Sequence, residues 1–440
     1  MDTNNNYVGI STRMSGTVKA LAPTAAKVST DVAASPDDIC LNKGENNIMK
    51  PKMVAVCKEA MDKGIAVEAF SNPSGFSGDQ TLKEALAQYI STYFHPTIPI
   101  TPSQVIPTAG SGNAVEALLF TLCDAGDSVL CPAPGWWGYS VYGLLHAGVN
   151  IIPAGITAPE KSWSTESLSS AIVPALEEAY HSAPAPGRIK ALITSNPNNP
   201  FARCWSPAAV RDMMDFCHRY GLHYISDEVF ANTLFDPQTD QFVSALSLLK
   251  GSETTESELA SEEKNAPKSV IDPGSVHIIW SMTKDFGTCG VRSGCVATYN
   301  PLVRDGASYA SLWQVSSLTA IFTASVLTSP LLPPLISSVK SELKKAHQMC
   351  HDILACDELA GRADVLSSTA GLWVNVIITL REEETIGDVI ASARKCHVII
   401  DSSGDFTRFL DKTQAQIKVT FSLEENILKE GLLRLKAALL

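Results

Sequence analysis

The chain has 440 residues, of which 34 are basic and 46 acidic, so its formal net charge is −12. Hydrophobic residues make up 45% and charged residues 18%, which excludes a disordered or fibrous chain and provides core material for two or three domains. The negative charge disfavours nucleic acid as a partner, because binding to a phosphate backbone requires a basic face.

From about residue 100 to residue 300, short β-rich runs alternate with amphipathic helical patterns. The predicted strands are residues 103–108, 128–132, 150–154, 191–195, 223–227, 276–280 and 294–299, and helices are expected over 114–122, 166–180 and 208–221. This alternation indicates an α/β fold with a mainly parallel central sheet and helices on both faces. Ligands of such sheets bind beyond the carboxyl ends of the strands, so residues that follow a strand are the first functional candidates.

The second part of the chain has a different pattern. Residues 251–275 are polar, acidic and rich in Ser, Glu and Pro, and we expect a mobile surface loop there. Beyond residue 301 follow a helical stretch, two strand-like runs and a last helix, which predict a smaller α+β domain. These elements are expected over 335–355, 371–380, 415–422 and 427–440.

The remaining composition points to a cytoplasmic protein with no membrane partner. No stretch approaches the roughly 20 apolar residues that span a bilayer, and the polar start of the chain does not resemble a signal peptide. The eleven cysteines are scattered without a Cys-x-x-Cys pair. That spacing suits neither a metal site nor a disulfide framework, so we expect buried thiols in a reducing compartment.

Two loops after predicted strands carry small or amide residues. Residues 109–114 read Ala-Gly-Ser-Gly-Asn-Ala and precede a predicted helix, where free backbone N–H groups can bind an anion; a simple tight turn is the commoner role. Val115 stands where a dinucleotide-binding loop has its third glycine, and the loop is not a Walker sequence either. Residues 195–200 read Ser-Asn-Pro-Asn-Asn-Pro, which indicates a stiff turn.

Two further positions after strands are ionisable. Asp227 ends a predicted strand, where a carboxylate is poorly solvated and normally has a partner, although a helix N-cap is an alternative. Lys284 lies in Ser-Met-Thr-Lys-Asp-Phe-Gly, residues 281–287, upstream of Arg292. A lysine between hydroxyls and an arginine is typical of a covalently bound cofactor beside a phosphate site. The Asp-Phe-Gly is not a kinase signature, since no His-Arg-Asp or glycine-rich kinase loop accompanies it.

The order of these features resembles that of the fold-type-I pyridoxal-phosphate enzymes of aminotransferase class I and II. It runs from the phosphate loop through the Asn-Pro turn, the aspartate and the lysine to the arginine. The runs Gly-Glu-Asn-Asn at 44–47 and Gly-Phe-Ser-Gly at 75–78 are similar to the 1-aminocyclopropane-1-carboxylate synthase-like branch. Within that branch the chain looks most like the carbon–sulfur lyases of gliotoxin-type pathways. The resemblance implies a homodimer with shared active sites. It also implies three parts: an N-terminal segment (1–55) that packs with the small domain, a large cofactor-binding domain (56–310) and the small domain (311–440).

The resemblance also implies roles for matching residues. Lys284 would hold pyridoxal 5′-phosphate as an imine and act as the base at the substrate's Cα, while Asp227 would keep the ring nitrogen protonated. Trp136 would stack on the ring, with Trp137 as the alternative. The other residues expected at the cofactor are Ser111, Gly112, Asn113, Asn199, Phe230, Ser281, Thr283 and Arg292, and those expected at the substrate are Glu45, Phe76 and Lys418.

Three positions depart from the branch. Phe230 stands where relatives have a tyrosine, and the missing hydroxyl predicts a raised pKa of the cofactor imine. Phe76 replaces a tyrosine that reaches across the dimer, which argues against ring closure of S-adenosylmethionine. Lys418 replaces the arginine that clamps the α-carboxylate, and a point charge there is not equivalent to a planar fork; an error in the register of the small domain is the alternative.

These features favour β-elimination of cysteine S-conjugates, which yields a thiol, pyruvate and ammonia, in fungal sulfur-containing secondary metabolism. The alternatives are an aminotransferase, γ-elimination of the 1-aminocyclopropane-1-carboxylate synthase type, and a catalytically silent protein. Retention of Lys284, Asp227, Asn199 and Arg292 together argues against the silent protein.

Overall fold

The structure is a computed structural model, which describes residues 9–30, 35–72, 75–155, 168–249, 270–402 and 410–440. Most of the loop expected over 251–275 lies outside these residues. Its last part is described, and Pro273–Ser275 form a short 3-10 helix.

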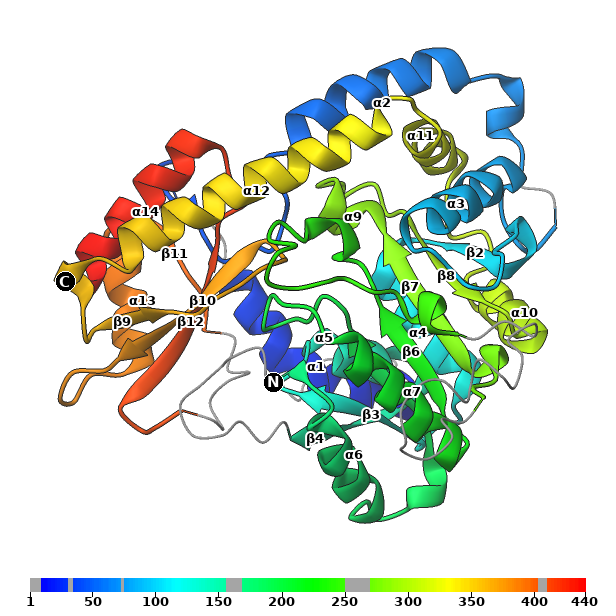
Figure 1. Cartoon of the computed structure of the whole chain (residues 1–440), viewed down its shortest axis with the longest axis horizontal. Helices are drawn as coiled ribbons and strands as arrows, with labels where there is room; N and C mark the ends of the chain where they lie inside the picture. Colours follow the sequence, from blue (N-terminus) through cyan, green and yellow to red (C-terminus); the bar gives the residue numbers. More distant parts are fainter. Residues whose placement is uncertain (1–8, 31–34, 73–74, 156–167, 250–269, 403–409) are drawn as a thin grey trace.

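A seven-stranded sheet lies at the centre of the larger part of the molecule (Figure 1). Only β8 in this sheet runs antiparallel to its neighbours, so the predicted mainly parallel α/β fold is confirmed. The strands are nearly continuous apolar runs because helices cover both faces of the sheet. Their order is β2 (Val105–Thr108), β8 (Gly294–Thr298), β7 (Val276–Ser281), β6 (His223–Asp227), β5 (Ile189–Ser195), β3 (Ser128–Ala133) and β4 (Asn150–Gly155).

The register of this sheet brings the ends of its strands to one edge. Gly294 of β8 pairs with both Thr108 and Ser281, so β2 and β7 end at the same level. Ser195 pairs with Asp227 in the same way. The loops that follow β2, β5, β6 and β7 therefore leave the sheet side by side.

Helices around the sheet begin and end at recognisable residues. In α7 (Pro207–Tyr220), the Ser206 hydroxyl accepts a hydrogen bond from the Ala209 N–H at 3.1 Å, and Gly221 ends the helix with φ +65°. The other helices of this part are α2 (Lys50–Gly64), α3 (Gln80–Tyr93), α4 (Gly110–Leu122), α5 (Gly138–Tyr142), α6 (Ile172–His181), α9 (Met282–Asp285), α10 (Pro301–Ala310) and α11 (Ser317–Leu327).

A second, three-stranded antiparallel sheet has β10 (Trp373–Thr379) at its centre, between β12 (Gln414–Thr420) and β9 (Ala363–Val365). It is accompanied by α12 (Leu332–Leu354), α13 (Ile386–Lys395) and α14 (Glu425–Leu439). Near it, β1 (Ile39–Cys40) pairs in parallel with β11 (Val398–Ile399), so an N-terminal segment of the chain contacts a C-terminal one.

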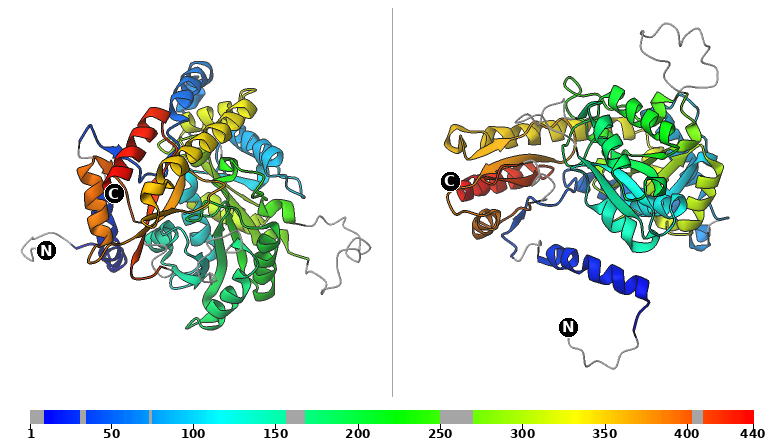
Figure 2. Two further views of the ribbon diagram at one scale, coloured as in Figure 1. Left: turned by 60° about the vertical axis from the view of Figure 1, so that its left-hand side comes forward. Right: turned by 90° about the horizontal axis from the view of Figure 1, so that it is seen from below.

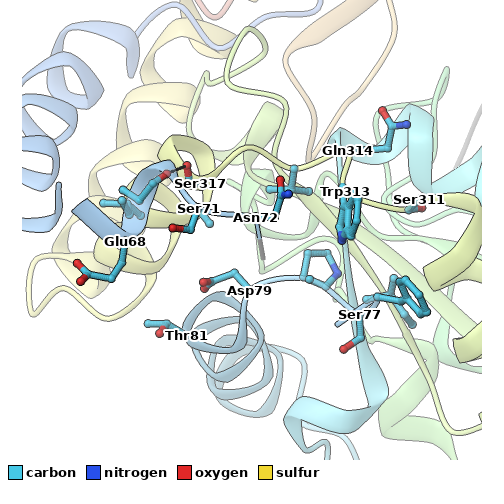
Figure 3. Close-up of a pocket in the computed structure, with 18 of the residues that line it drawn as sticks. Glu68, Ser71, Asn72, Ser77, Asp79, Thr81, Ser311, Trp313, Gln314 and Ser317 are labelled. Carbon is cyan, nitrogen blue, oxygen red and sulfur yellow. Dashed lines mark hydrogen bonds between the residues drawn. The ribbon is translucent and has the colours of Figure 1, made fainter. Parts of the chain in front are cut away.

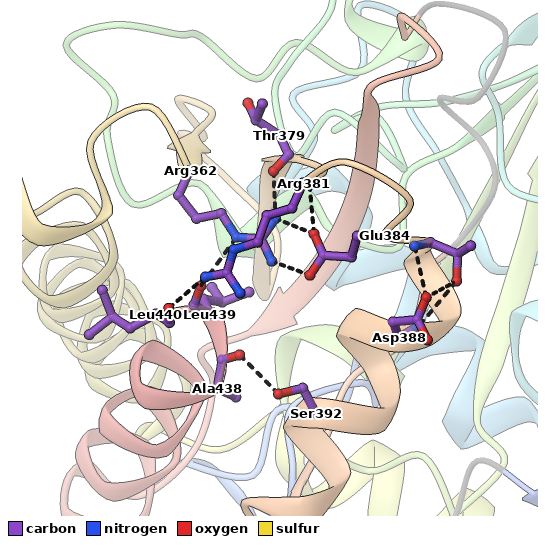
Figure 4. Close-up of polar contacts among 10 residues, drawn as sticks. Arg362, Thr379, Arg381, Glu384, Asp388, Ser392, Ala438, Leu439 and Leu440 are labelled. Atoms are coloured by element: carbon purple, nitrogen blue, oxygen red, sulfur yellow. Dashed lines mark hydrogen bonds and ion pairs between the residues drawn. The ribbon is translucent and has the colours of Figure 1, made fainter.

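A polar cluster ties the end of this smaller part together (Figure 4). The Arg362 guanidinium donates to both oxygens of Glu384, at 2.6 and 2.7 Å, and its Nε donates to the Leu439 carbonyl. On α13, the Ser392 hydroxyl donates to the Ala438 carbonyl at 3.0 Å. The cluster therefore fixes α14 to the loop before α13 and to β10.

The first helix, α1 (Thr12–Thr30), lies to one side of the remaining chain (Figure 2, right). Among the described residues no single helix is long and apolar enough to cross a membrane. The pair α11 and α12 meets that test jointly, but the chain bends by 85° between them.

Candidate active site

A cavity of about 460 Å³ opens where the carboxyl ends of the large sheet face the smaller sheet. Residues from the N-terminal segment, the large sheet and β12 all line it, although they are far apart in the sequence. The predicted site residues that line it are Glu45, Ser111, Gly112, Trp136, Asn199, Asp227, Phe230, Thr283, Lys284, Arg292 and Lys418.

Lys284 extends from the short helix α9 directly after β7. Its Nζ donates a hydrogen bond to the Gly44 carbonyl at 2.7 Å, and burial lowers the pKa of its amine. Asn46 holds the same turn, because its Nδ2 donates to the carbonyls of Lys284 at 3.2 Å and Asp285 at 3.1 Å. The N-terminal segment thus positions the lysine.

Asp227 ends β6 at the floor of the cavity and is 3% exposed. The Tyr139 hydroxyl donates to its Oδ2 at 2.9 Å, and burial raises the pKa of its carboxyl to about 6. The Tyr139 hydroxyl that donates to this carboxylate carries no charge. A bound cofactor whose ring nitrogen is protonated would supply the positive charge that is missing.

The loop between β2 and α4 lies against Arg292. The guanidinium donates to the carbonyls of Ala109 at 2.8 Å and Cys289 at 3.1 Å, and a Cβ on Gly110, which has φ +82°, would stand 2.6 Å from its Nη2. Only glycine therefore fits at Gly110.

Two buried hydroxyls lie at the same end of the cavity. Ser281 Oγ and Thr283 Oγ1 have no hydrogen-bond partner within the described chain. Unpaired buried hydroxyls, an arginine and the first turn of α4 together suit an anion, because each would gain hydrogen bonds from one. The residues present therefore fit a phosphate group. Ser281 is fully buried and does not itself line the cavity.

The side chain of Asn113, a residue expected at the cofactor, makes a hydrogen bond within its own loop. Its Oδ1 accepts a hydrogen bond from the Ala109 N–H at 3.0 Å, and it does not line the cavity. It closes the loop that carries Ser111 and Gly112.

The amide of Asn199 is oriented by the smaller sheet. Lys418 Nζ on β12 donates to Asn199 Oδ1 at 3.0 Å and lies 3.5 Å from the ring centroid of Trp373. With its oxygen toward Lys418, the amide has its donor nitrogen on the other side. Phe230 contacts the same Trp373 ring edge-on at 5.2 Å.

The two adjacent tryptophans differ in their surroundings. Trp136 packs edge-on against Tyr139, the residue that holds Asp227, with ring centroids 5.2 Å apart. Trp137 also lines the cavity, but 49% of its surface is exposed. These contacts favour Trp136 as the ring that covers a ligand above Asp227.

Glu45 lies between this cavity and a neighbouring surface hollow. Burial opposes its charge, but a 2.5 Å ion pair with Lys50 and the nearby charge of Lys284 hold the pKa of its carboxyl below the usual value. Glu45 therefore brings a negative charge to the rim.

Residues 36–431 match the family model for aminotransferase class I and II. The chain belongs to this family. A probable aminotransferase, aclI, of Aspergillus oryzae is 30% identical over 98% of both chains. The probable aminotransferase gliI of Aspergillus fumigatus is 26% identical over 78% of this chain and 74% of its own. A 1-aminocyclopropane-1-carboxylate synthase of Oryza sativa subsp. indica is 29% identical over 71% of this chain and 61% of its own.

The fold agrees with this assignment. An aspartate aminotransferase of Thermus thermophilus, solved with maleate, superimposes with a TM-score of 0.70 at 16% identity, covering 98% of this chain and all of the other. The chain is therefore a pyridoxal-phosphate-dependent enzyme of the aminotransferase fold, similar to the 1-aminocyclopropane-1-carboxylate synthases.

Phe76 lies outside the cavity of this family member. It lines a second cavity of about 530 Å³ between the segment 64–81 and the residues around Trp313 (Figure 3). Its ring is 57% exposed and packs edge-on against Tyr309 at 5.9 Å. A part in substrate binding remains a prediction for the dimer.

Sequence reasoning assigned no role to several residues of the site, among them Tyr139, Tyr142, Asn46 and Trp373. Tyr139 and Tyr142 belong to a short segment without a recognisable motif. Asn46 lies in the Gly-Glu-Asn-Asn sequence at 44–47, but that sequence did not predict a role for it. The hydrogen-bond partner of Tyr139 is 88 residues away in the sequence, and that of Asn46 is 238 residues away. The spacing of Tyr139, one helical turn after Trp136, is the one local signal that could have identified it.

Proposed function

We propose that this protein is a carbon–sulfur lyase that cleaves cysteine S-conjugates by β-elimination. Pyridoxal phosphate supplies an electron sink for the electron pair left at the substrate's Cα. Lys284 would hold it covalently, Asp227 would pair with its ring nitrogen, and Asn199 would donate to its phenolic oxygen. Ser111, Gly112, Ser281, Thr283 and Arg292 would hold its phosphate.

The environment of Lys284 carries the proposal. Burial lowers the pKa of its amine, so more of it is the free base at neutral pH. Once the substrate's amino group has replaced it on the cofactor, the freed Lys284 amine would take the Cα proton, and the Cβ–S bond would break with its electron pair on sulfur. A thiolate needs little protonation to leave, so this one base is sufficient.

The charges around the cavity support a neutral side chain on the substrate. Arg292 is the one arginine among the described residues that line it, and its guanidinium is bonded to the loop carbonyls of Ala109 and Cys289. Within the described part of one chain, a second substrate carboxylate, as in aspartate transamination, would meet only the lysines of the wall and no free arginine fork. A cysteine thioether needs none.

The test is product analysis with a purified cysteine S-conjugate. We expect thiol and pyruvate to be released in equal amounts when no 2-oxo acid is added as an acceptor. Turnover that requires an added 2-oxo acid would instead establish an aminotransferase, the alternative that the family and its relatives favour. Methylthioadenosine release from S-adenosylmethionine would establish γ-elimination. A protein that neither binds the cofactor nor turns over would be catalytically silent.

We also propose a cytoplasmic homodimer that acts in the sulfur-containing secondary metabolism of a fungus. Around the second cavity, large apolar side chains are more than half exposed, among them Val67, Phe70, Phe76, Tyr309 and Trp313. Burial of such side chains is the usual driving force of a stable interface. Light scattering should give twice the mass of one chain, and Phe70→Glu should shift the protein toward monomers.

A further inference from the structure

The hydroxyl of Tyr142 lies at the start of α4. A Cβ added to Gly112 would stand 2.3 Å from Tyr142 Oη and 2.5 Å from its Cζ. The phenol therefore occupies the space of a side chain on the first turn of the helix. Free backbone N–H groups collect at this turn and attract anions.

Tyr142 belongs to the wall of the same cavity. It lines the cavity with Ser111, Gly112 and Arg292, and its ring lies 5.9 Å from that of Trp136. Its hydroxyl has no hydrogen-bond partner in the part of the chain that the structure describes. A polar group in the wall of a cavity that Arg292 and Thr283 also line would gain a bond from an anion.

We propose that Tyr142 donates its hydroxyl proton to the phosphate of pyridoxal phosphate. The inference rests on the phosphate site proposed above but not on the lyase reaction. A neutral phenol adds a charge-assisted hydrogen bond without adding positive charge beside Arg292. If the ring only packed against Trp136, the hydroxyl would contribute nothing to cofactor affinity.

The variant Tyr142→Phe separates these roles, because it keeps the ring and removes the hydroxyl. The apoprotein is titrated with pyridoxal phosphate and with pyridoxal, which lacks the phosphate, and binding is followed by absorbance. We expect the Kd for pyridoxal phosphate to rise roughly tenfold, with the Kd for pyridoxal unchanged. An unchanged Kd for pyridoxal phosphate, or an equal loss for both ligands, would overturn the proposal.

The matched control is Tyr180→Phe on α6, where a half-buried ring packs on Tyr220 at 4.3 Å, away from the cavity. Neither Kd should change in this variant. As a second measurement, the ³¹P chemical shift of the bound cofactor should move in Tyr142→Phe and not in Tyr180→Phe. The same shift in all three proteins would refute a contact between the hydroxyl and the phosphate. Both readouts are independent of the reaction catalysed.

Discussion

The two larger sheets of the molecule hold poorly exposed carboxylates in opposite ways. At the carboxyl edge of the large sheet, Asp227, Glu228 and Asp285 are at most 3% exposed, and burial raises their pKa values to about 6, 7 and 7. Beside the small sheet, the hydrogen bonds from Arg362 hold the pKa of Glu384 below its usual value.

On the role proposed for Asp227, the difference separates a carboxylate that serves a ligand from one that serves the fold. Glu384 is neutralised inside the protein, so it needs no further partner. Asp227 is held by the neutral phenol of Tyr139, and its charge becomes favourable when a cation binds. Glu228 and Asp285 do not line the cavity, so a raised pKa alone does not mark a functional group.

The largest effect is expected from Lys284→Ala. Loss of both the covalent attachment and the base should lower kcat by roughly 10⁴-fold. Lys344→Ala, at an exposed position of α12, is the control and should retain full activity. Steady-state thiol release measures both, and substantial turnover in Lys284→Ala would contradict the assigned role.

Asp227→Asn tests whether the charge at the cavity floor matters. An amide of the same shape should lower kcat on the order of 100-fold, since it cannot pair with a protonated ring nitrogen. Glu228→Gln is the matched variant, because Glu228 is equally buried and adjacent but does not line the cavity. Equal losses of activity in the two variants would show that Asp227 has no role in the reaction that its buried neighbour Glu228 lacks.

Arg362→Ala should act on stability and not on turnover. Removing the guanidinium leaves Glu384, whose side chain is 15% exposed, without its ion-pair partner. The free energy of unfolding should fall by about 3 kcal/mol. Arg434→Ala breaks the more exposed pair with Glu430 and should cost about 0.5 kcal/mol or less. Urea unfolding measures both; equal costs would show that burial of the pair is unimportant.

The smallest effect is a change in the pH dependence of stability. The folded-state pKa of Glu228 is raised from 4.5 to about 7, so the folded protein holds the proton more tightly and loses stability as the pH rises through that range. In Glu228→Gln this loss should shrink, on the order of 1 kcal/mol.

Glu384→Gln provides the opposite case. Because the pKa of Glu384 is lowered, its contribution to stability is lost only as the pH falls below about 4.5. The stability difference between pH 5 and pH 7 should therefore stay as in the starting protein. Thermal unfolding at the two pH values measures this difference in stability. A smaller difference in Glu384→Gln than in the starting protein would contradict the opposite behaviour expected of Glu384 and Glu228.

Strong local patterns allowed most of the large sheet to be predicted. The seven runs expected between residues 103 and 299 agree with the observed strands within about two residues at each end, because buried parallel strands are continuous apolar runs. The two-residue strands β1 and β11 escaped notice, since they exist through pairing with each other and not through propensity.

The site was predictable where chemistry follows a strand directly. Asp227 and Lys284 stand at strand ends, so topology alone brings them together. The amide oxygen of Asn113 accepts from the Ala109 N–H, a contact within the loop that the sequence analysis did not predict. Tyr139 could not be assigned because its partner is 88 residues away.

The contact between Gly44 and Lys284 has a consequence for the order in which the protein is completed. The two residues are 240 positions apart, and Asn46 bridges nearly the same interval. During synthesis the early segment must wait until α9 has left the ribosome before its carbonyl can meet the lysine. Contacts of such long range form late and carry the largest loop-closure cost. Lys284 is thus seated only in molecules in which the segment around Gly44 has already packed against α9, so its reactivity would report that this long-range contact has formed.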